Sequence, residues 1–297
     1  MSEPSTFDVH ATIGALFVYP IKSCAGVQVQ EAILTETGLE LDRAWMVVDQ
    51  HGEFVTQRDL PRMALIVPQL KYSEMVVRAP GMLALHIQIS AVESACRATV
   101  WGHDCAAYDM GDVAAQWLSD FLNQELPSGY PAQKLRLVRF DPEHRRLSDK
   151  KWTGEIDALN QFADGYPLLV LSQAAVDELN TRIAASGHSP VSAQRFRPNI
   201  VLEGAQAHDE DRWDALHIDT PDGVVELPLV KPCARCSIPN VDPQTALSDV
   251  RLGDTLQSYR TSPRMDGAIT FGMNAAIRQG FECTLRVGQS VSARWQF

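Results

Sequence analysis

The sequence predicts a mainly β protein with some α-helix, an α+β fold in which a β-barrel-like N-terminal domain precedes a second β-rich domain. In the first 110 residues, short apolar segments alternate with turn signals such as Glu36-Thr-Gly38 and Gln50-His-Gly52. Many short strands with little helix between them are typical of antiparallel sheets and barrels. The length of 297 residues suits two domains, which we place at residues 8–130 and 131–297.

The first half is expected to contain one helix and a series of strands. The helix is predicted over residues 112–121, because apolar residues repeat there at helical spacing. Pro127-Ser-Gly-Tyr-Pro131 has the composition of a linker. The strands are predicted at residues 13–19, 27–34, 44–48, 75–77, 83–89 and 98–101.

The second half is expected to be richer in strands than in helix. Residues 141–163 are polar and are predicted to form a long surface excursion. The apolar run 168–171 predicts a strand buried on both faces. Ser172 is the expected N-cap of a helix that runs to about residue 185 and ends near Gly187. A short helix is predicted at 252–259, and strands at 135–140, 199–202, 215–218, 224–229, 269–277, 283–287 and 291–295.

Composition excludes several classes of function. The net charge is −11, and His144-Arg-Arg146 is the largest basic block, so we expect no nucleic-acid partner. No apolar stretch approaches membrane-span length, and residues 1–8 lack the pattern of a secretory signal. Six irregularly spaced cysteines indicate reduced thiols in a cytoplasmic protein. An anionic ligand would have to be held by local cations against the overall negative charge.

The stretch Cys233-Ala-Arg-Cys236 is the strongest chemical signal. Prolines on both sides of it favour an irregular loop. The guanidinium between the two thiols favours thiolate, the form of cysteine that binds metals or acts as a nucleophile.

This cysteine pair leaves three alternatives open. A structural zinc site needs four ligands, and the other cysteines stand alone in the sequence. A thioredoxin-like couple would begin a helix, but Pro239 and Pro243 follow too closely for a long one. A pair of buried structural thiols is the plain alternative, because free cysteine is commonly buried.

Other polar residues suggest an anion site. Lys22 and Ser23, at the end of the first strand, offer an ammonium and a hydroxyl, although a solvated turn would look the same. For Arg43 and Arg58 the default explanation is surface charge, whereas Arg197 enters an apolar strand and needs an anionic partner or carbonyl acceptors.

Asp157 and Asp242 are candidate proton donors. Asp242 suits a turn equally well, because it precedes Pro243. Together, these features indicate a thiolate near several cations, as expected for an anionic cofactor whose metal takes one cysteine.

These segments resemble the MOSC-domain proteins of the two-domain type, which have an N-terminal MOSC β-barrel domain. The similarity is to the mitochondrial amidoxime reducing component and its bacterial counterparts, here without the ferredoxin domain that some bacterial relatives carry and without the mitochondrial membrane anchor. The matching stretches run in family order: Tyr19-Pro-Ile-Lys-Ser-Cys24, Asp42-Arg-Ala-Trp45, Val55-Thr-Gln-Arg58, Phe196-Arg-Pro-Asn-Ile200, Cys233-Ala-Arg-Cys236 with Val241-Asp-Pro243, and Phe271-Gly272.

The resemblance implies that the chain binds the molybdenum cofactor, a molybdopterin with a terminal phosphate. Cys236 would then ligate molybdenum, and Cys233 would be structural. Asn274 stands where the mitochondrial proteins have an aromatic residue, so this chain departs from the family pattern there. The family's cofactor contacts carry over to Lys22, Ser23, Arg43, Arg197, Asn199 and Arg235.

The implied activity is reduction of small N-hydroxylated compounds, namely amidoximes, hydroxylamines or N-hydroxylated bases, without pyridoxal phosphate. Electrons would come from a separate protein of the ferredoxin, flavoprotein or cytochrome type, and no membrane or nucleic-acid partner is expected. Two other functions remain open: a molybdenum-cofactor carrier or sulfur-transfer protein that uses Cys236, and a zinc-stabilised binding domain. The cofactor is expected between the two halves of the chain, since cofactor sites favour domain interfaces.

Overall fold

The computed structural model describes residues 7–91, 93–126, 128–185, 187 and 189–296, and its largest element is a nine-stranded sheet. Strand β12 pairs with both β13 and β17, so seven strands of this sheet close into a ring in the order β12, β13, β1, β19, β14, β15, β17. Their bounds are β1 (Val9–Val18), β12 (Leu168–Ser172), β13 (Ile200–Glu203), β14 (Ala215–Thr220), β15 (Gly223–Ala234), β17 (Ala268–Ala275) and β19 (Ser290–Ala293). Two further strands, β2 (Val27–Val29) and β16 (Thr261–Ser262), pair with β1 and β17.

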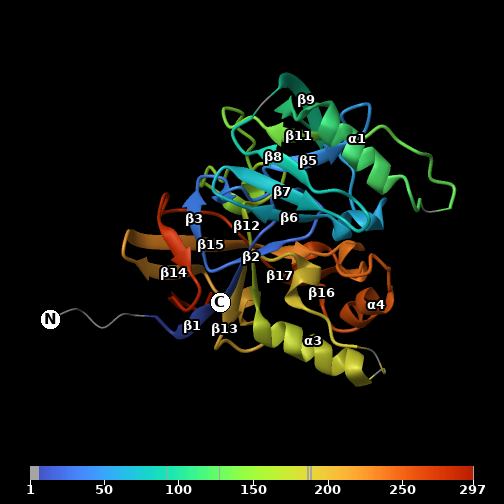
Figure 1. Cartoon of the computed structure of the whole chain (residues 1–297). Helices are drawn as coiled ribbons and strands as arrows, with labels where there is room; N and C mark the ends of the chain where they lie inside the picture. Colours follow the sequence, from blue (N-terminus) through green and yellow to red (C-terminus); the bar gives the residue numbers. More distant parts are fainter. Residues whose placement is uncertain (1–6, 92, 127, 186, 188, 297) are drawn as a thin grey trace.

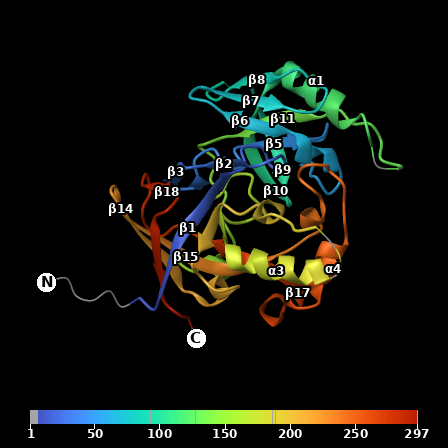
Figure 2. The ribbon, with the colours of Figure 1, turned by 60° about the horizontal axis from the view of Figure 1, so that its bottom comes forward.

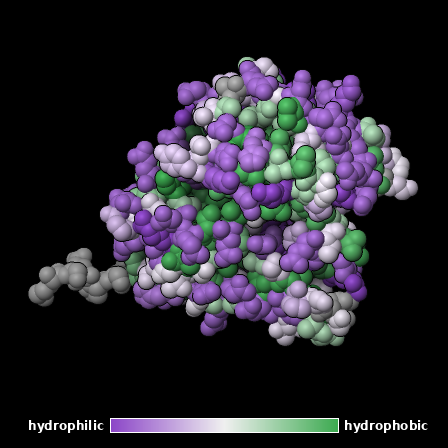
Figure 3. All heavy atoms as spheres, viewed as in Figure 1, coloured by the Kyte–Doolittle hydropathy of each residue, from purple (hydrophilic) through white to green (hydrophobic). Residues whose placement is uncertain are grey.

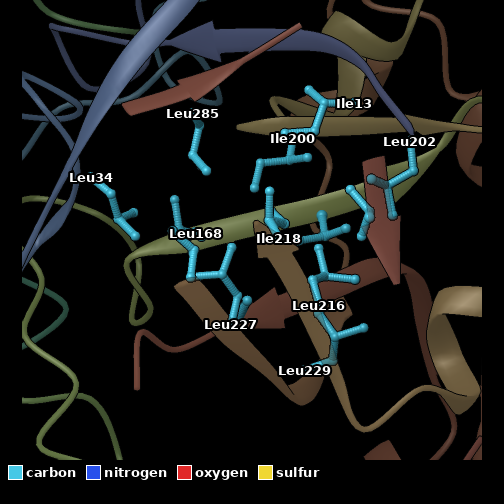
Figure 4. Packing of buried hydrophobic residues seen from close by; sticks show 14 of the residues in the cluster. Ile13, Leu34, Leu168, Ile200, Leu202, Leu216, Ile218, Leu227, Leu229 and Leu285 are labelled. Carbon is cyan, nitrogen blue, oxygen red and sulfur yellow. The ribbon is translucent and has the colours of Figure 1, made fainter. Parts of the chain in front are cut away.

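Apolar side chains fill this barrel. Ile13, Leu168, Ile200 and Leu216 come from four different strands and are at most 1% exposed. Figure 4 shows such side chains pointing toward one another from the surrounding strands. Replacing one of them by alanine would lower the free energy of unfolding by about 2–5 kcal/mol. The close packing makes the barrel a rigid support for the loops at its end.

A second group of sheets lies above the barrel in Figure 1 and carries helix α1 (Gly111–Leu122). The largest of them has the order β5-β11-β10-β9. Its strands are β5 (Trp45–Val48), β9 (Ser94–Val100), β10 (His103–Asp109) and β11 (Arg136–Phe140). Two three-stranded sheets complete the fold: β6 (Val67–Leu70), β7 (Glu74–Arg78) and β8 (Leu85–Gln88), and β3 (Glu31–Thr35), β4 (Gly38–Leu39) and β18 (Thr284–Arg286).

Strand pairing crosses the predicted domain boundary at 130/131. Strand β1, from the start of the chain, pairs with β13 and β19, which come from the second half. In the other direction, β11 pairs with β5 and β10 of the first half. The boundary itself stays a prediction, and the two halves of the sequence are joined by shared sheets.

Helices α3 (Gln173–Ala185) and α4 (Arg251–Gln257) pack outside the barrel, and Figure 2 shows them close to β17. Helix α3 begins directly after Ser172, as predicted, and Val176 and Leu179 bury its apolar face. Short helical turns occupy α2 (Lys150–Thr153), η1 (Pro61–Leu65), η2 (Ala193–Phe196), η3 (Asp209–Arg212), η4 (Ile238–Asn240) and η5 (Pro263–Met265).

The predicted mainly β fold with a β-barrel-like domain is confirmed, whereas two local predictions are wrong. Residues 141–163 are not a surface excursion throughout, because Arg146, Asn160 and Phe162 are buried. The Arg146 guanidinium donates to the carbonyl oxygens of Gln161 and Ala163, which makes burial of this cation tolerable. The segment before Cys236 is not a loop throughout, since β15 extends to Ala234 with register shifts.

The surface is mixed in polarity. Figure 3 shows hydrophilic and hydrophobic residues interspersed on one face of the molecule. Among the described residues, no helix combines the length and the apolar character that a membrane crossing requires. The polar residues 1–6 and Pro127 of the predicted linker lie outside the described residues.

Candidate functional site

All seven residues predicted for the cofactor site line one cavity of about 110 Å³. Three of them belong to the first half of the chain and lie in the segments that follow β1 and precede β5. The other four belong to the second half and lie in the segments after η2 and β15. The cavity therefore lies between parts of the chain that are far apart in sequence, as expected. The seven residues are Lys22, Ser23, Arg43, Arg197, Asn199, Arg235 and Cys236.

Three of these residues have a left-handed backbone that side chains other than glycine rarely adopt. Their φ angles are 65° at Ser23, 51° at Arg43 and 59° at Arg197. Each such conformation costs on the order of 1–3 kcal/mol and persists only where the surrounding structure holds it, which is common at ligand sites. Here the backbone N–H of Arg43 donates to the Tyr19 carbonyl at 2.8 Å, so the two site segments hold each other.

Lys22 and Ser23 are buried at the cavity wall. The Lys22 ammonium donates to the Phe162 carbonyl at 2.8 Å and is paired with the Asp164 carboxylate. Burial lowers the pKa of the Lys22 ammonium, and Asp164 offsets only part of that effect. The Ser23 carbonyl accepts a hydrogen bond from the Gln57 amide at 3.3 Å.

Arg43 and Asn199 form a linked pair. Arg43 donates to the Asp42 carboxylate, to Asn199 Oδ1 at 3.1 Å and to the Arg197 carbonyl at 3.0 Å. Asn199 also accepts from the Leu169 N–H at 3.1 Å, so its amide ties β12 to the arginine cluster. Its position in the cavity is thereby fixed by strand pairing.

Two guanidiniums keep buried N–H groups without a partner among the described residues. Arg197 donates from Nη1 to the Cys24 carbonyl at 2.6 Å, while its Nη2 has no partner. Arg235 donates to Cys233 Sγ and to the Phe196 carbonyl, both at 3.0 Å, while its Nε has none. Burial, followed by the charge of Arg43, lowers the pKa of Arg197 to about 10, so it stays charged at neutral pH. Unpaired buried donors are costly, and both guanidiniums belong to residues that line the inner cavity.

The two cysteines of the pair differ in their surroundings. Cys233 lies within β15, is partly buried and accepts from Arg235. Cys236 follows the strand, is exposed and is a free thiol at the cavity. Its sulfur is neither sealed in apolar side chains nor bonded to Cys233, so it is free to ligate a metal.

A wider cavity of about 560 Å³ adjoins the first one. The two share lining residues, including Asp164, Tyr166, Cys233 and Asn274, so they lie next to each other. The Lys231 ammonium lies 5.5 Å from the centroid of the Tyr166 ring at this outer cavity. Cys236 lines the inner cavity, and the outer cavity lies beside it.

The remaining candidates separate clearly. Arg58 lines the inner cavity, with its guanidinium 4.7 Å from the Trp101 ring centroid. Asp157 is instead paired with Lys150 on the surface, and Asp242 with Arg195. Neither aspartate lines the inner or the outer cavity, so neither is placed to exchange protons there.

Asp164 and Tyr166 line both cavities but were not among the predicted site residues. The signal that points to them is their position just before the buried run at 168–171, because polar residues at the ends of buried strands often face a site. Within the described ranges, no three side chains of His, Cys, Asp or Glu gather to hold a metal ion, so the four-ligand zinc alternative lacks a ligand set there.

Comparison with known proteins agrees with the sequence resemblance. Residues 10–125 match the MOSC N-terminal beta barrel domain, and residues 157–292 match the MOSC domain. Mitochondrial amidoxime-reducing component 1 is 35% identical in Mus musculus, over 94% of this chain and 81% of that protein. The Homo sapiens protein of that name is 36% identical over 94% of this chain and 82% of its own length.

Comparison with mitochondrial amidoxime reducing component 2 gives a similar result. The Homo sapiens protein is 36% identical over 84% of this chain and 72% of its own length. Both domains are thus present in one chain, and the likeness extends over most of its length. The chain belongs to the family of two-domain MOSC proteins that includes the mitochondrial amidoxime-reducing components.

Proposed function

We propose that this protein is a molybdenum-cofactor-dependent reductase of N-hydroxylated compounds such as amidoximes, hydroxylamines and N-hydroxylated bases. The observation that carries the proposal is the free Cys236 thiol in a cavity whose guanidiniums keep unpaired N–H groups. The names of the relatives, amidoxime-reducing components, support the same reaction class.

The donor set fits the cofactor. A thiolate at Cys236 is a soft ligand, as molybdenum accepts, and the surrounding cations suit a phosphate-bearing pterin. Lys22, Ser23, Arg43, Arg197, Asn199 and Arg235 would hold its anionic part. When bound, the cofactor supplies the two-electron chemistry that converts an N-hydroxyl group into N–H.

Residues at the outer cavity would orient the substrate. The side chain of Asp164 is 65% exposed. Loss of hydration at the carboxylate raises its pKa, but the Lys22 ammonium more than offsets that rise, so the pKa lies below the usual range. The carboxylate therefore accepts hydrogen bonds from amidoxime or hydroxylamine N–H and O–H groups. Burial raises the pKa of the Tyr166 phenol, so this hydroxyl keeps its proton at working pH.

The overall reaction requires a partner. Removal of oxygen from an N-hydroxyl group consumes two electrons and two protons and releases water. We propose that a separate ferredoxin, flavoprotein or cytochrome supplies the electrons, and that the protein works in the cytoplasm. Neither a membrane nor a nucleic acid has a part in this scheme.

The test uses purified full-length protein loaded with cofactor, reduced viologen as electron donor and benzamidoxime as substrate. The wild type is expected to contain one molybdenum per chain and to release benzamidine. Cys236→Ala should lose at least about a thousandfold in kcat, whereas the control Cys233→Ala should retain most activity. Wild type that holds cofactor yet reduces no N-hydroxylated compound would exclude the reductase.

A second candidate is a cofactor carrier or sulfur-transfer protein. The exposure of Cys236 favours it, because a group that is handed on must be reachable by the recipient. A carrier would release its cofactor to an apo-enzyme within minutes and would show little reductase activity. Retention of cofactor during dialysis against an apo-enzyme acceptor would exclude this alternative.

A further inference from the structure

The ring of Tyr19 lies against two arginine side chains of the inner cavity. The Cζ atom of Arg43 is 4.5 Å from the ring centroid, and that of Arg197 is 4.2 Å from it. Tyr19 directly follows β1 and is 1% exposed. Cations within about 6 Å of an aromatic face are attracted by it, most strongly where water is excluded.

Tyr19 does not line the inner cavity itself. It lines a separate cavity of about 80 Å³, together with Gly26, Gln57 and Arg197. A ligand in the inner cavity would therefore contact the two guanidiniums but not the phenol of Tyr19. Any effect of Tyr19 on such a ligand acts through Arg43 and Arg197.

The backbone and the ring of Tyr19 are tightly held. Its N–H donates to Asp42 Oδ1 at 2.8 Å, and its carbonyl accepts from the Arg43 N–H at 2.8 Å. A Cβ added at Gly26 would lie 2.5 Å from the ring atom Cε1, so the neighbouring chain packs closely on the ring. The ring is thus a fixed surface rather than a mobile side chain.

The two guanidiniums repel each other. After burial, the charge of Arg43 is the next largest effect that lowers the pKa of Arg197. Of the two, only Arg43 is paired with a carboxylate, that of Asp42, among the ion pairs of the described residues. Attraction of both cations to the same aromatic ring offsets part of this repulsion.

The phenol hydroxyl contributes little to this arrangement. It is buried and has no hydrogen-bond partner among the described residues. Burial raises its pKa, so the group stays neutral and adds no negative charge. The aromatic face is therefore the part of Tyr19 that acts on the arginines.

We propose that Tyr19 is a positioning residue whose aromatic ring holds the Arg43 and Arg197 guanidiniums in place to bind an anionic ligand. The inference rests on the proposed function, in which that ligand is the phosphate-bearing cofactor. It assigns a role in cofactor binding to a residue that never touches the cofactor.

The experiment compares full-length wild type with Tyr19→Phe and Tyr19→Leu, each freed of cofactor. Binding of a fluorescent pterin carrying a phosphate monoester is titrated at two salt concentrations, and thermal unfolding is recorded with and without it. Tyr19→Phe keeps the aromatic face and should bind within about twofold of wild type. Tyr19→Leu should bind about tenfold more weakly and should show a smaller ligand-induced rise in Tm.

The possible results distinguish failure of this inference from failure of the proposed function. A folded Tyr19→Leu that binds like wild type overturns the inference. A Tyr19→Phe that binds as weakly as Tyr19→Leu also overturns it, because the hydroxyl would then matter. If Tyr19→Leu does not fold, Tyr19→Met replaces it, since methionine adapts to irregular gaps. Wild type that binds neither the phosphorylated pterin nor molybdenum rejects the proposed function as well, whereas normal binding by wild type and the aliphatic variant rejects this inference alone.

Discussion

The Lys22 ammonium is paired with the Asp164 carboxylate, 142 positions further along the chain, and both side chains line the same cavity. The pair joins the segment after β1 to the segment before β12. It leaves Lys22 with a second acceptor, the Phe162 carbonyl. A buried cation at the wall of the cavity is thereby held in one place before any ligand arrives.

We predict that Asp164→Asn destabilises the protein by about 1–2 kcal/mol. The loss is smaller than the 3–5 kcal/mol typical of a fully buried pair, because the Asp164 side chain is 65% exposed. Urea unfolding measures it. The double variant Lys22→Met/Asp164→Asn should be more stable than Asp164→Asn alone, since it leaves no unpaired buried ammonium. Equal stabilities of the single and double variants would contradict this account.

We predict that Arg235→Lys weakens cofactor retention by about tenfold. The planar guanidinium donates to Cys233 Sγ and to the Phe196 carbonyl at once, and a lysine ammonium does not reproduce this fork. Pterin and molybdenum content per purified chain measure the effect. Arg264→Lys, at an exposed position in η5, is the matched control and should retain wild-type content. Equal content in both variants would mean that the geometry of Arg235 is unimportant.

We predict that Glu210→Gln makes the protein more stable at pH 8 but not at pH 4.5. Glu210 is fully buried, and burial raises the pKa of its carboxyl from 4.5 to about 7. The folded protein therefore holds this proton more tightly than the unfolded chain does. The contribution of Glu210 to the free energy of unfolding is largest below pH 4.5 and falls between pH 4.5 and 7. Above that range it is lower by on the order of 3 kcal/mol.

His208 has the opposite effect in nearly the same range. Burial lowers the pKa of its imidazole from 6.5 to about 4, so its contribution to stability rises with pH between these values. The wild-type curve should be nearly flat from pH 4.5 to 6.5, whereas that of Glu210→Gln should rise. Gln keeps an oxygen to accept the Ser172 N–H, so the variant should fold. Parallel curves from urea unfolding at five pH values would refute the assignment. The charged groups around the two residues are Glu178, Arg182, Asp211 and Arg260.

We predict that Gly272→Ala is far more harmful than Gly267→Ala. Both glycines have positive φ, at 78° and 80°, so alanine costs about 1–2 kcal/mol at either position. At Gly272, however, the added Cβ would lie 2.7 Å from the Val170 carbonyl, where β12 pairs with β17 to close the barrel. At Gly267 nothing lies within 4 Å. Urea unfolding should show a loss of at least about 3 kcal/mol for Gly272→Ala only, together with reduced cofactor content because Asn274 follows closely.

Much of the fold followed from periodicity. The apolar run at 168–171 predicted a doubly buried strand, and every residue of β12 is buried. The helix at 112–121 is confirmed as α1, one residue longer at each end. In contrast, β10 was not predicted, because its first two residues, His103 and Asp104, are polar and exposed, which is typical of a turn.

The candidate site was predicted in part. Short motifs identified seven of the residues that line the inner cavity, although their roles toward the cofactor stay a prediction. Asp164 and Arg146 were missed because their partners arise only from the folded chain. Lys22 is distant in sequence, and the carbonyls that accept from Arg146 converge only when residues 161–164 turn back on it. Local composition therefore indicated solvent where the fold provides acceptors.

The pairing of β1 with β19 has a consequence for how the protein is made. β19 spans residues 290–293, so β1 lacks this neighbour until the ribosome has synthesised more than 270 further residues. Its other long partner, β13, is also synthesised late. The nascent N-terminal segment therefore keeps an open strand edge until these later strands have been synthesised.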